Sequence, residues 1–560
     1  MRTSLISVYN KEGITEFAKD LISLDFKILA SGGTAKHLKD AGVPVSDVAD
    51  LVGGGAILGH RVVTLSREIH AGLLAKDNEE DRKELETLKI PFIDLVCSDL
   101  YPLEDEINNP ASTPESVIEK TDIGGPTIIR SAAKGGRVVI CEPSDRDKVL
   151  EWLKGGEPDR EEFINNLRAK AEITISRYCL LSSKYHSGGK YRGLLGERKI
   201  ECSYGENAYQ KPASLYSSDS SGVGHPTVGC PTPDALAIHN WQLVAGNPLS
   251  YNNICDVDRM IQTVTHIGAG FEKNMGEIPN IAIGAKHGNA CGAGVGDDAV
   301  GKMLLGDLRA IFGGSVMLNF PVDEKVAEEL INKYSIEGVR RLLDVVAAPS
   351  FTQQAVEILS RKKGKCRLLQ NSAIEKAGLS SLDSTSRFRY VRGGFLTQPN
   401  YTFVPKLDPS LILPFAGEEG TLKDVILAWA IGCTSNSNTI TLVKDGRLYG
   451  NGVGQQDRVG AAKLAIFRAD EAAAFASESF KLSGERLKLS LAADLENAVA
   501  YSDSFFPFPD APEVLIDRGI KTIFSTSGSV NDDKIIELCN KKGVKLIILK
   551  DAEARGFYQH

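Results

Sequence analysis

The chain has 560 residues, of which 42% are hydrophobic and 25% are charged. This is ordinary globular composition, and it excludes a disordered, collagen-like or coiled-coil description of the whole chain. Lys and Arg number 65 against 73 Asp and Glu, and the resulting net charge of −8 disfavours a dedicated nucleic-acid binder. No apolar run approaches the ~20 residues that a membrane span needs, so we expect no membrane partner.

The cysteines and histidines point to an intracellular protein without a resident metal. The ten cysteines contain no Cys-x-x-Cys pair, and the nine histidines contain no His-x-x-x-His pair, which excludes the common zinc motifs. The amino terminus lacks the apolar stretch of a signal peptide. We therefore expect reduced thiols and a cytoplasmic location.

Residues 1–145 alternate short β-rich runs with helical stretches. Strands are predicted at 4–8, 26–30, 92–97 and 137–141, and helices at 11–24 and from 35 onward. Strand–helix alternation with short loops predicts an α/β domain in which helices cover both faces of a parallel sheet.

The remaining chain is predicted to form a connector and a larger unit. Residues 146–200 are expected to be a helical connector, with helices at 145–153 and 160–181. Residues 201–560 form the larger unit, with strands at 281–285 and 439–443 and helices at 326–334 and 532–541. Two segments within it, 312–330 and 505–518, both run from an aromatic loop through a Pro-containing turn to an amphipathic helix, which suggests an internal duplication.

Two Gly-Gly sequences open predicted helices in the first domain. Ser31-Gly32-Gly33-Thr34 follows a strand, and its backbone N–H groups at a helix N-terminus suit a phosphate. The alternative is a glycine turn with a Thr cap. Asp122 precedes Gly124-Gly125, and Arg130 and Lys134 share one face of the helix that follows. That pattern favours a second part of a site over two solvated cations.

Lys286 and His287 end a predicted buried strand and precede a Gly-rich loop. A His can act as a base near neutral pH, and a neighbouring cation can stabilise an oxyanion. The alternative is a surface charge beside a capping His. Neighbouring residues on a regular strand point to opposite faces, so a shared site requires the strand to end or bulge here.

Three further segments carry polar or aromatic groups. Residues 434–438 and 452–458 supply amides, hydroxyls and Arg458, which suit a polar heterocycle and an anion, although both could be plain polar turns. Residues 502–510 contain three Phe and Asp510. They suggest a wall for an aromatic ring or simply a packed loop.

Taken in order, these segments resemble the family of bifunctional purine-biosynthesis enzymes with AICAR transformylase and IMP cyclohydrolase activities. The landmarks span nearly the whole chain: SVYNK, ASGGTAKHL, LYP, DIGGPTIIRSAAK, SYGEN, LSYNN, KHGNACG, FGG, APSFTQQAVEIL, SNS, GVGQQDR and SDSFFPFPD. The resemblance implies a methylglyoxal-synthase-like N-terminal domain and a C-terminal unit of two cytidine-deaminase-like halves. The zinc-deaminase signature is missing, so no catalytic zinc is expected. The family forms homodimers with transformylase sites across the interface.

The resemblance also implies the chemistry and its residues. A formyl group would pass from 10-formyltetrahydrofolate to the 5-amine of AICAR, giving FAICAR, which then closes to IMP. His287 would be the base, with Lys286 and Asn436 assisting, and Tyr101, Asp122 and Lys134 would move protons in ring closure. Substrate-binding residues matched by position are Tyr204, Asn253, Gly313, Asp344, Arg458, Phe505 and Asp510 in the second unit. In the first domain they are Ser7, Ser31, Gly32, Gly33, Thr34, Arg61 and Thr64.

The chain departs from the family pattern at several functional positions. A family Lys is replaced by Val63, and a phosphate-binding Arg by Ser203. The C-terminal family Arg is replaced by Gly556, with Arg555 beside it. Three alternatives stay open: a transformylase without cyclohydrolase activity, an N-terminal domain that binds nucleotide only as a regulator, and formyl transfer to a different nucleotide.

Overall fold

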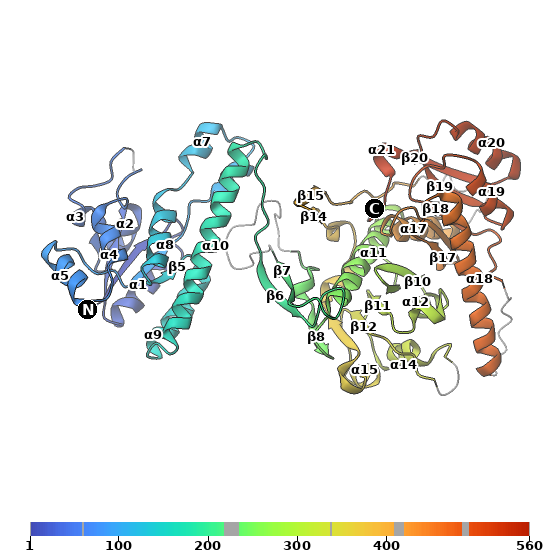
Figure 1. The fold of residues 1–560 in the computed structure, drawn as a ribbon, viewed down its shortest axis with the longest axis horizontal. Coiled ribbons are helices and arrows are strands. Elements are labelled where there is room, and N and C mark those ends of the chain that lie inside the picture. Colours follow the sequence, from blue (N-terminus) through green and yellow to red (C-terminus); the bar gives the residue numbers. More distant parts are fainter. Residues whose placement is uncertain are drawn as a thin grey trace. The chain divides into compact units, whose positions relative to one another are not determined.

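A computed structural model describes residues 2–58, 61–217, 234–335, 339–407, 419–483 and 492–558. The chain divides into two compact units, one built on residues 1–197 and the other on 198–216 and 234–560 (Figure 1). Within the described ranges, none of the helices has the length and apolar character needed to cross a membrane.

The first unit contains a five-stranded sheet in the order β3-β2-β1-β4-β5, in which every pair is parallel. This confirms the α/β prediction. The strands are β1 (Arg2–Ser7), β2 (Phe26–Ala30), β3 (Ser46–Asp47), β4 (Leu95–Ser98) and β5 (Val138–Ile140). The helices up to the last strand are α1 (Ile14–Ser23), α2 (Gly32–Asp40), α3 (Val48–Leu51), α4 (Arg67–Leu74), α5 (Glu79–Thr87), α6 (Leu103–Asn108), α7 (Pro114–Glu119) and α8 (Gly124–Lys134).

The predicted connector differs from the structure. Its helices, α9 (Arg146–Lys154) and α10 (Arg160–His186), belong to the first unit. Their apolar side chains join the same buried cluster as the strands, and Trp152 stacks on Phe163 at 4.4 Å between ring centroids. Both helices have an apolar face that is stable only when buried, so they complete the domain that was expected to end at 145.

The second unit is built on an eleven-stranded sheet in the order β20-β19-β18-β16-β17-β10-β9-β11-β12-β13-β8. Its strands are β8 (Gln242–Ala245), β9 (Ile281–Lys286), β10 (Asn289–Val295), β11 (Ser315–Leu318), β12 (Val345–Ala348), β13 (Arg367–Gln370), β16 (Ile440–Lys444), β17 (Arg447–Gly452), β18 (Val499–Ser502), β19 (Thr522–Ser527) and β20 (Lys545–Lys550). Two separate hairpins are β6 (Glu197–Cys202) with β7 (Ala213–Ser217), and β14 (Ser386–Val391) with β15 (Gly394–Pro399).

The sheet of the second unit consists of two halves with the same topology. Each half has an antiparallel hairpin, β9–β10 or β16–β17, followed by three mutually parallel strands, and β10 pairs with β17 where the halves meet. A long helix precedes each half, α11 (Tyr251–Met275) and α17 (Glu419–Cys433), and the two pack together with the sheet around one buried cluster. The arrangement agrees with the suspected duplication.

The remaining helices of this unit divide between the two halves. In the first half they are α12 (Ala299–Leu304), α13 (Leu308–Ile311), α14 (Glu324–Asn332) and α15 (Gln353–Leu359). In the second half they are α18 (Arg458–Ser483), α19 (Asp510–Asp517), α20 (Asp532–Lys542) and α21 (Asp551–Ala554). The helices α14 and α19 are equivalent, as their sequences suggested. The aromatic loops before them are not equivalent, because residues 312–314 precede β11 whereas residues 505–508 follow β18.

Strand directions bring distant segments to one edge of this sheet, which we call edge A. The strands β9, β17 and β18 end there, and β10, β11, β12 and β16 begin there, because hairpin partners are antiparallel. The segments after Lys286, before Ser315, before Val345, before Ile440 and after Ser502 therefore all lie along edge A. These segments contain most of the residues that the family resemblance assigns to the transformylase site, with Tyr204 and Asn253 as exceptions.

Glycines on β17 let α18 approach closely, which places Arg458 at edge A. A Cβ added to Gly450 would lie 2.1 Å from the backbone oxygen of Ala465, and one added to Gly452 would lie 2.1 Å from that of Ala461. Side chains at these positions would push the helix away from the strand.

Replacing Gly450 by valine is therefore expected to lower the free energy of unfolding by about 3 kcal/mol, the upper part of the usual range for overpacking. The control is Gly55→Val in an exposed loop of the first unit, where an added Cβ meets nothing within 4 Å. Urea denaturation of both variants checks this. Equal stabilities for the two would contradict the close packing of α18 on β17.

Candidate active site

Lys286 and His287 lie at the tip of the β9–β10 hairpin. Lys286 pairs with Asn289 across the hairpin, and the two turn residues His287 and Gly288 both have positive φ, 52° and 69°. These values are those of a type I′ turn. The strand therefore ends at Lys286, which satisfies the condition set by the sequence. His287 is exposed, and Lys286 Nζ donates to the backbone oxygen of Phe312 at 3.1 Å.

Asp256 on α11 binds the backbone of this turn. Its Oδ1 accepts the backbone N–H of Gly288 at 2.7 Å, and its Oδ2 accepts the hydroxyl of Ser315 at 3.3 Å. Burial raises the pKa of Asp256, while these two hydrogen bonds and the nearby His287 oppose the rise. Asp256 thus fixes the backbone that presents His287, a role that the sequence did not indicate.

Asn436 reaches the same edge from the second half. It lies between α17 and β16, and its backbone N–H donates to Asn289 Oδ1 at 3.3 Å, on the hairpin that carries His287. Its own Oδ1 accepts a hydrogen bond from Arg259 Nη1 at 3.1 Å. The structure therefore brings Lys286, His287 and Asn436 together, although 149 positions separate the last two in the chain.

The second half also contributes a buried ion pair. Arg458, the first residue of α18, pairs with Asp503 just after β18, and the two side chains are 9% and 0% exposed. Arg458 Nη1 also donates to the Ser502 hydroxyl at 3.3 Å. Beside this pair, the guanidinium of Arg555 lies 5.7 Å from the ring centre of Phe505. Because its charge is already paired, Arg458 can bind a substrate anion only through its remaining N–H groups.

The other predicted transformylase residues divide into two groups. Gly313 (φ 72°) and Asp344 lie at edge A before β11 and β12, and Asp344 accepts a hydrogen bond from Arg361 Nη1 at 3.2 Å. Asn253, in contrast, is buried as the N-terminal cap partner of Ser250 on α11, and Tyr204 accepts the backbone N–H of Tyr251. Asp510 is exposed and is the first residue of α19. Its Oδ1 accepts the backbone N–H of the next residue, Ala511, at 2.8 Å.

In the first unit the hydroxyl residues gather at the carboxyl edge of the parallel sheet. Ser7 and Ser31 share a hydrogen bond of 2.8 Å, and Thr34 Oγ1 donates to the backbone oxygen of Val8 at 3.1 Å. A Cβ built on Gly32 or Gly33 meets nothing within 4 Å, so the start of α2 is open to a ligand. The arrangement fits the predicted phosphate loop.

Tyr101 and Asp122 lie at the same edge. The carboxylate of Asp122 faces the backbone N–H groups of Tyr101, Gly124 and Gly125, the last at 2.9 Å. Burial raises the pKa of Asp122 despite these donors, and burial with the nearby Asp122 raises the pKa of Tyr101. Thr64 is close as well, since a Cβ on Gly124 would lie 3.0 Å from its hydroxyl. Such a pair of perturbed groups is typical of a proton-transfer site.

Lys134 does not join this cluster, which corrects the expected trio. It is the exposed last residue of α8, whereas Asp122 precedes the first. Ten helical steps separate the ends of α8 by about 15 Å. The helix after a parallel strand returns to the opposite edge of the sheet, so Lys134 lies at the amino edge. Arg61, another predicted substrate-binding residue, forms an exposed ion pair with Glu119.

Comparison with known proteins decides the family. The family model described as AICARFT/IMPCHase bienzyme matches residues 132–468, more than half of the chain, and an MGS-like domain model matches residues 13–127. The chain belongs to the AICARFT/IMPCHase bienzyme family. The MGS-like match agrees with the expected methylglyoxal-synthase-like domain.

Full-length relatives carry the same assignment. Proteins named "bifunctional purine biosynthesis protein PurH" from Bacillus cytotoxicus, Acetivibrio thermocellus and Staphylococcus carnosus are 34%, 35% and 33% identical, each covering 98% of both chains. A crystal structure of a protein called ForH is 32% identical over 34% of this chain and all of that chain, with a TM-score of 0.30, which does not bear on the fold.

Three residues outside the predicted set contact the predicted site of this bienzyme-family member in the first unit. Lys11 Nζ donates to the backbone oxygen of Tyr9 at 3.1 Å beside the phosphate-type loop, and burial lowers the pKa of Lys11. Asp99 accepts the backbone N–H of Asn10 at 3.0 Å. Tyr178 Oη accepts the N–H of Asp122 at 2.6 Å from α10. Lys11 is the last residue of the SVYNK landmark and Asp99 directly precedes the LYP landmark, whereas Tyr178 belongs to no landmark.

At the first-unit site an apolar residue, Val63, stands where the family has a lysine. Val63 packs partly against the buried cluster of the sheet domain. Val63 is itself partly exposed, so the replacement removes a charge at the margin of this cluster and leaves an apolar contact. The departure from the family at position 63 therefore lies at the margin of the core of the first unit.

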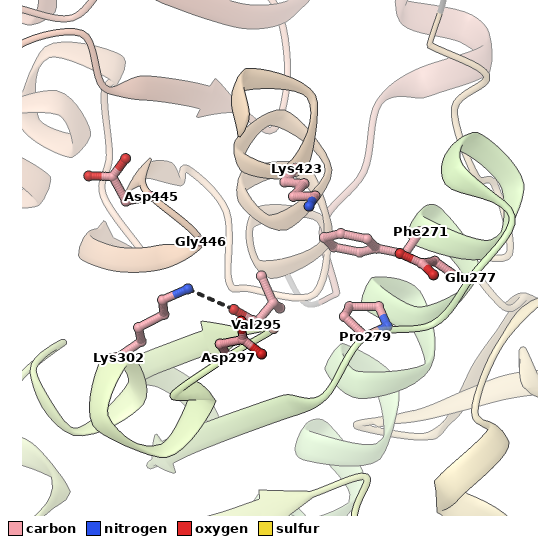
Figure 2. A pocket seen from close by; sticks show the side chains of 10 residues that line it. Phe271, Glu277, Pro279, Val295, Asp297, Lys302, Lys423, Asp445 and Gly446 are labelled. Carbon is pink, nitrogen blue, oxygen red and sulfur yellow. Dashed lines mark hydrogen bonds between the residues drawn. The ribbon is translucent and has the colours of Figure 1, made fainter. Parts of the chain in front are cut away.

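A cavity of about 350 Å³ lies at the edge of the second sheet opposite to edge A. Phe271, Val295, Lys302, Lys423 and Asp445 line it, and Lys302 Nζ donates to the Val295 backbone oxygen at 2.9 Å (Figure 2). The six-residue strand β9 separates this edge from His287 by about 20 Å. The cavity thus contains none of the candidate catalytic residues. Among the described residues, no group of His, Cys, Asp and Glu is arranged to hold a metal ion.

Proposed function

We propose that this enzyme transfers the formyl group of 10-formyltetrahydrofolate to the 5-amine of AICAR and then closes the product, FAICAR, to IMP. The observation that carries the proposal is the meeting of Lys286, His287 and Asn436, from two halves of one sheet, in a chain of the bienzyme family. The bifunctional relatives do not favour the alternative of a transformylase alone.

Formyl transfer needs a base because the 5-amine of AICAR is a poor nucleophile. Its lone pair is delocalised into the ring and the carboxamide. His287 takes a proton as the nitrogen attacks the formyl carbon, and the new C–N bond leaves a negative charge on the formyl oxygen. Lys286 stabilises that oxygen or protonates the folate nitrogen as its bond to the formyl carbon breaks. Asn436 supplies a further polar contact to the reacting groups.

Ring closure would use the first unit. The carboxamide nitrogen attacks the new formamide carbon, and water leaves. Asp122 and Tyr101 are the proton carriers at the carboxyl edge, and Ser31, Gly32 and Gly33 hold the phosphate. Lys134 is not assigned a step, because it lies at the other end of α8.

We further propose that the protein acts as a homodimer in the cytoplasm, as the family resemblance implies. The β14–β15 hairpin supports a dimer. It is a two-stranded sheet in which Tyr390 is 81% and Leu396 is 59% exposed. An apolar partner surface would bury these exposed side chains and so stabilise the hairpin. The ten scattered cysteines support a reducing compartment.

The formyl-transfer half is tested by incubating purified protein with AICAR and 10-formyltetrahydrofolate. Release of tetrahydrofolate is the expected result. A parallel reaction with the nucleoside in place of the nucleotide tests whether a phosphate is recognised at all, since Ser203 replaces the family Arg. Formyl transfer to neither substrate would overturn the proposal.

Ring closure is tested separately with FAICAR as the only substrate, and IMP is expected to form. Asp122→Asn is expected to lower the rate ~10²-fold or more, because it removes a proton carrier from the site. Lys134→Met should change the rate less than ~3-fold, since Lys134 lies about 15 Å from Asp122 along α8. No ring closure above background would contradict the bifunctional assignment. An equal loss in both variants would contradict the placement of Lys134.

A further inference from the structure

Arg259 is a buried arginine that reaches the candidate active site from α11. It is 5% exposed, and its Nη1 donates to the backbone oxygen of Thr434 at 2.8 Å and to the side-chain oxygen of Asn436 at 3.1 Å. A Cβ on Gly288, next to His287, would lie 4.0 Å from Arg259 Nη2. Arg259 therefore contacts the loop that carries Asn436 and approaches the turn that carries His287.

The C-terminal segment holds Arg259 in place. The ring of Tyr558 lies between two guanidinium groups, 3.9 Å from that of Arg259 and 3.8 Å from that of Arg387 on β14. We call this arrangement the tyrosine sandwich. The Tyr558 hydroxyl donates to Asp258 Oδ2 at 2.6 Å, and Arg387 Nη1 donates to the Tyr558 backbone oxygen at 2.6 Å. Tyr558 N–H donates in turn to the backbone oxygen of Ser435, next to Asn436.

The charges of Arg259, Arg387 and Asp258 explain why the tyrosine sandwich holds the Arg259 guanidinium in one orientation. Two guanidinium groups would repel each other in a buried setting, but the ring faces attract both, and the Asp258 carboxylate opposes their charge. Burial lowers the pKa of Arg259 to about 10, which leaves it charged at neutral pH. Stacking on one side and two hydrogen bonds on the other restrict the guanidinium to one plane.

The chemistry of the arginine then decides which way the Asn436 amide points. A guanidinium has five N–H donors and no acceptor, so the atom facing it must be the amide oxygen. The Asn436 NH₂ group is thereby directed to the other side. An NH₂ group can donate to a carbonyl oxygen that becomes negatively charged, whereas an amide oxygen would repel it.

We propose that Arg259, held by Tyr558, is a positioning residue that orients Asn436 so that its NH₂ group faces the reacting formyl oxygen. This inference rests on the proposed formyl transfer. It makes the C-terminal segment a structural part of the transformylase site. It also assigns a function to an arginine and a tyrosine that no motif singled out.

A double-mutant cycle in kcat for formyl transfer tests the proposal, using Arg259→Met, Asn436→Ala and the combination. Asn436→Ala is expected to lower kcat ~10²–10³-fold as the loss of one oxyanion donor. Arg259→Met should lower kcat ~10–100-fold by misplacing the amide, with KM for AICAR changed less than ~3-fold. In the Asn436→Ala background, Arg259→Met should change kcat less than ~3-fold, because the group that it orients is already gone.

Arg447→Met is the matched control. Arg447 is also a largely buried arginine over a tyrosine ring, 4.3 Å from the centre of Tyr449, but it lies at the start of β17, on the opposite edge of the sheet. Its replacement should cost stability without lowering kcat of the folded enzyme. A kcat loss as large as that of Arg259→Met would mean that general loosening explains both, and would overturn the proposal.

If Arg259→Met does not give folded protein, Tyr558→Leu provides the same test from the chain terminus. It should lower kcat ~10-fold alone and have no further effect with Asn436→Ala, and Tyr558→Phe, which keeps the stacked ring, should recover part of the loss. Multiplicative losses in either cycle would overturn the positioning role while leaving formyl transfer intact. Full activity of Asn436→Ala would instead overturn the proposed catalytic role of Asn436 itself.

Discussion

Replacing His287 by alanine is expected to lower kcat for formyl transfer by ~10²–10⁴-fold, the usual contribution of a general base. His287 is exposed at a hairpin tip and belongs to no buried cluster, so the variant should fold and keep its stability. Steady-state rates of tetrahydrofolate release, with thermal unfolding as a check on folding, measure the effect.

The matched control is His186→Ala, at the end of α10 in the first unit. It should leave formyl transfer unchanged. Ring closure of FAICAR should be unaffected by His287→Ala, because it is assigned to the first unit. Formyl transfer at the wild-type rate by His287→Ala would overturn the assignment of the base.

The second large effect is expected on stability. Arg458→Met leaves the carboxylate of Asp503 buried, at 0% exposure, without its cation. Removing one partner of a buried ion pair typically costs about 3–5 kcal/mol. The loss should appear in urea denaturation of the second unit, together with weaker binding of any anion at Arg458.

Two further variants separate the ion pair from other causes. Arg458→Met combined with Asp503→Leu should be more stable than Arg458→Met alone, because no charge is left buried. Arg309→Met removes an exposed pair with Glu471, with side chains 54% and 45% exposed, and should cost less than about 1 kcal/mol. A double variant less stable than the single one would show that the pair is not what matters there.

Much of the fold followed from local patterns. The strand at Phe26–Ala30 was predicted at the observed residues, and the strand at 281–285 was one residue short. Apolar runs of this length between turn residues are buried strands in any context. The predicted boundary at 145 falls too early, because α9 and α10 have charged sequences and only the folded domain shows that Trp152 and Ile164 are buried in its core.

The site was predictable in composition but not in arrangement. The adjacent Lys286 and His287 indicated acid–base chemistry, and the Gly-Gly loops indicated phosphate binding, because these residue types commonly have those roles. Lys134 shared a motif with Asp122, yet a helix of known rise separates them. Asp256, Arg259 and Tyr558 lie in none of the recognised motifs, because their roles depend on partners far away in the chain.

The sequence by itself determined the class of protein, the order of its elements and the residues able to act as bases, donors and phosphate loops, since these depend on composition and local spacing. Only the tertiary structure decided which of them meet. The direction of each strand brings Asn436 to His287 and takes Lys134 away from Asp122. The contacts of Tyr558 with Arg259 and Asp258 on α11 hold the arginine to which we assign the orientation of the Asn436 amide, and the sequence gives no sign of these contacts.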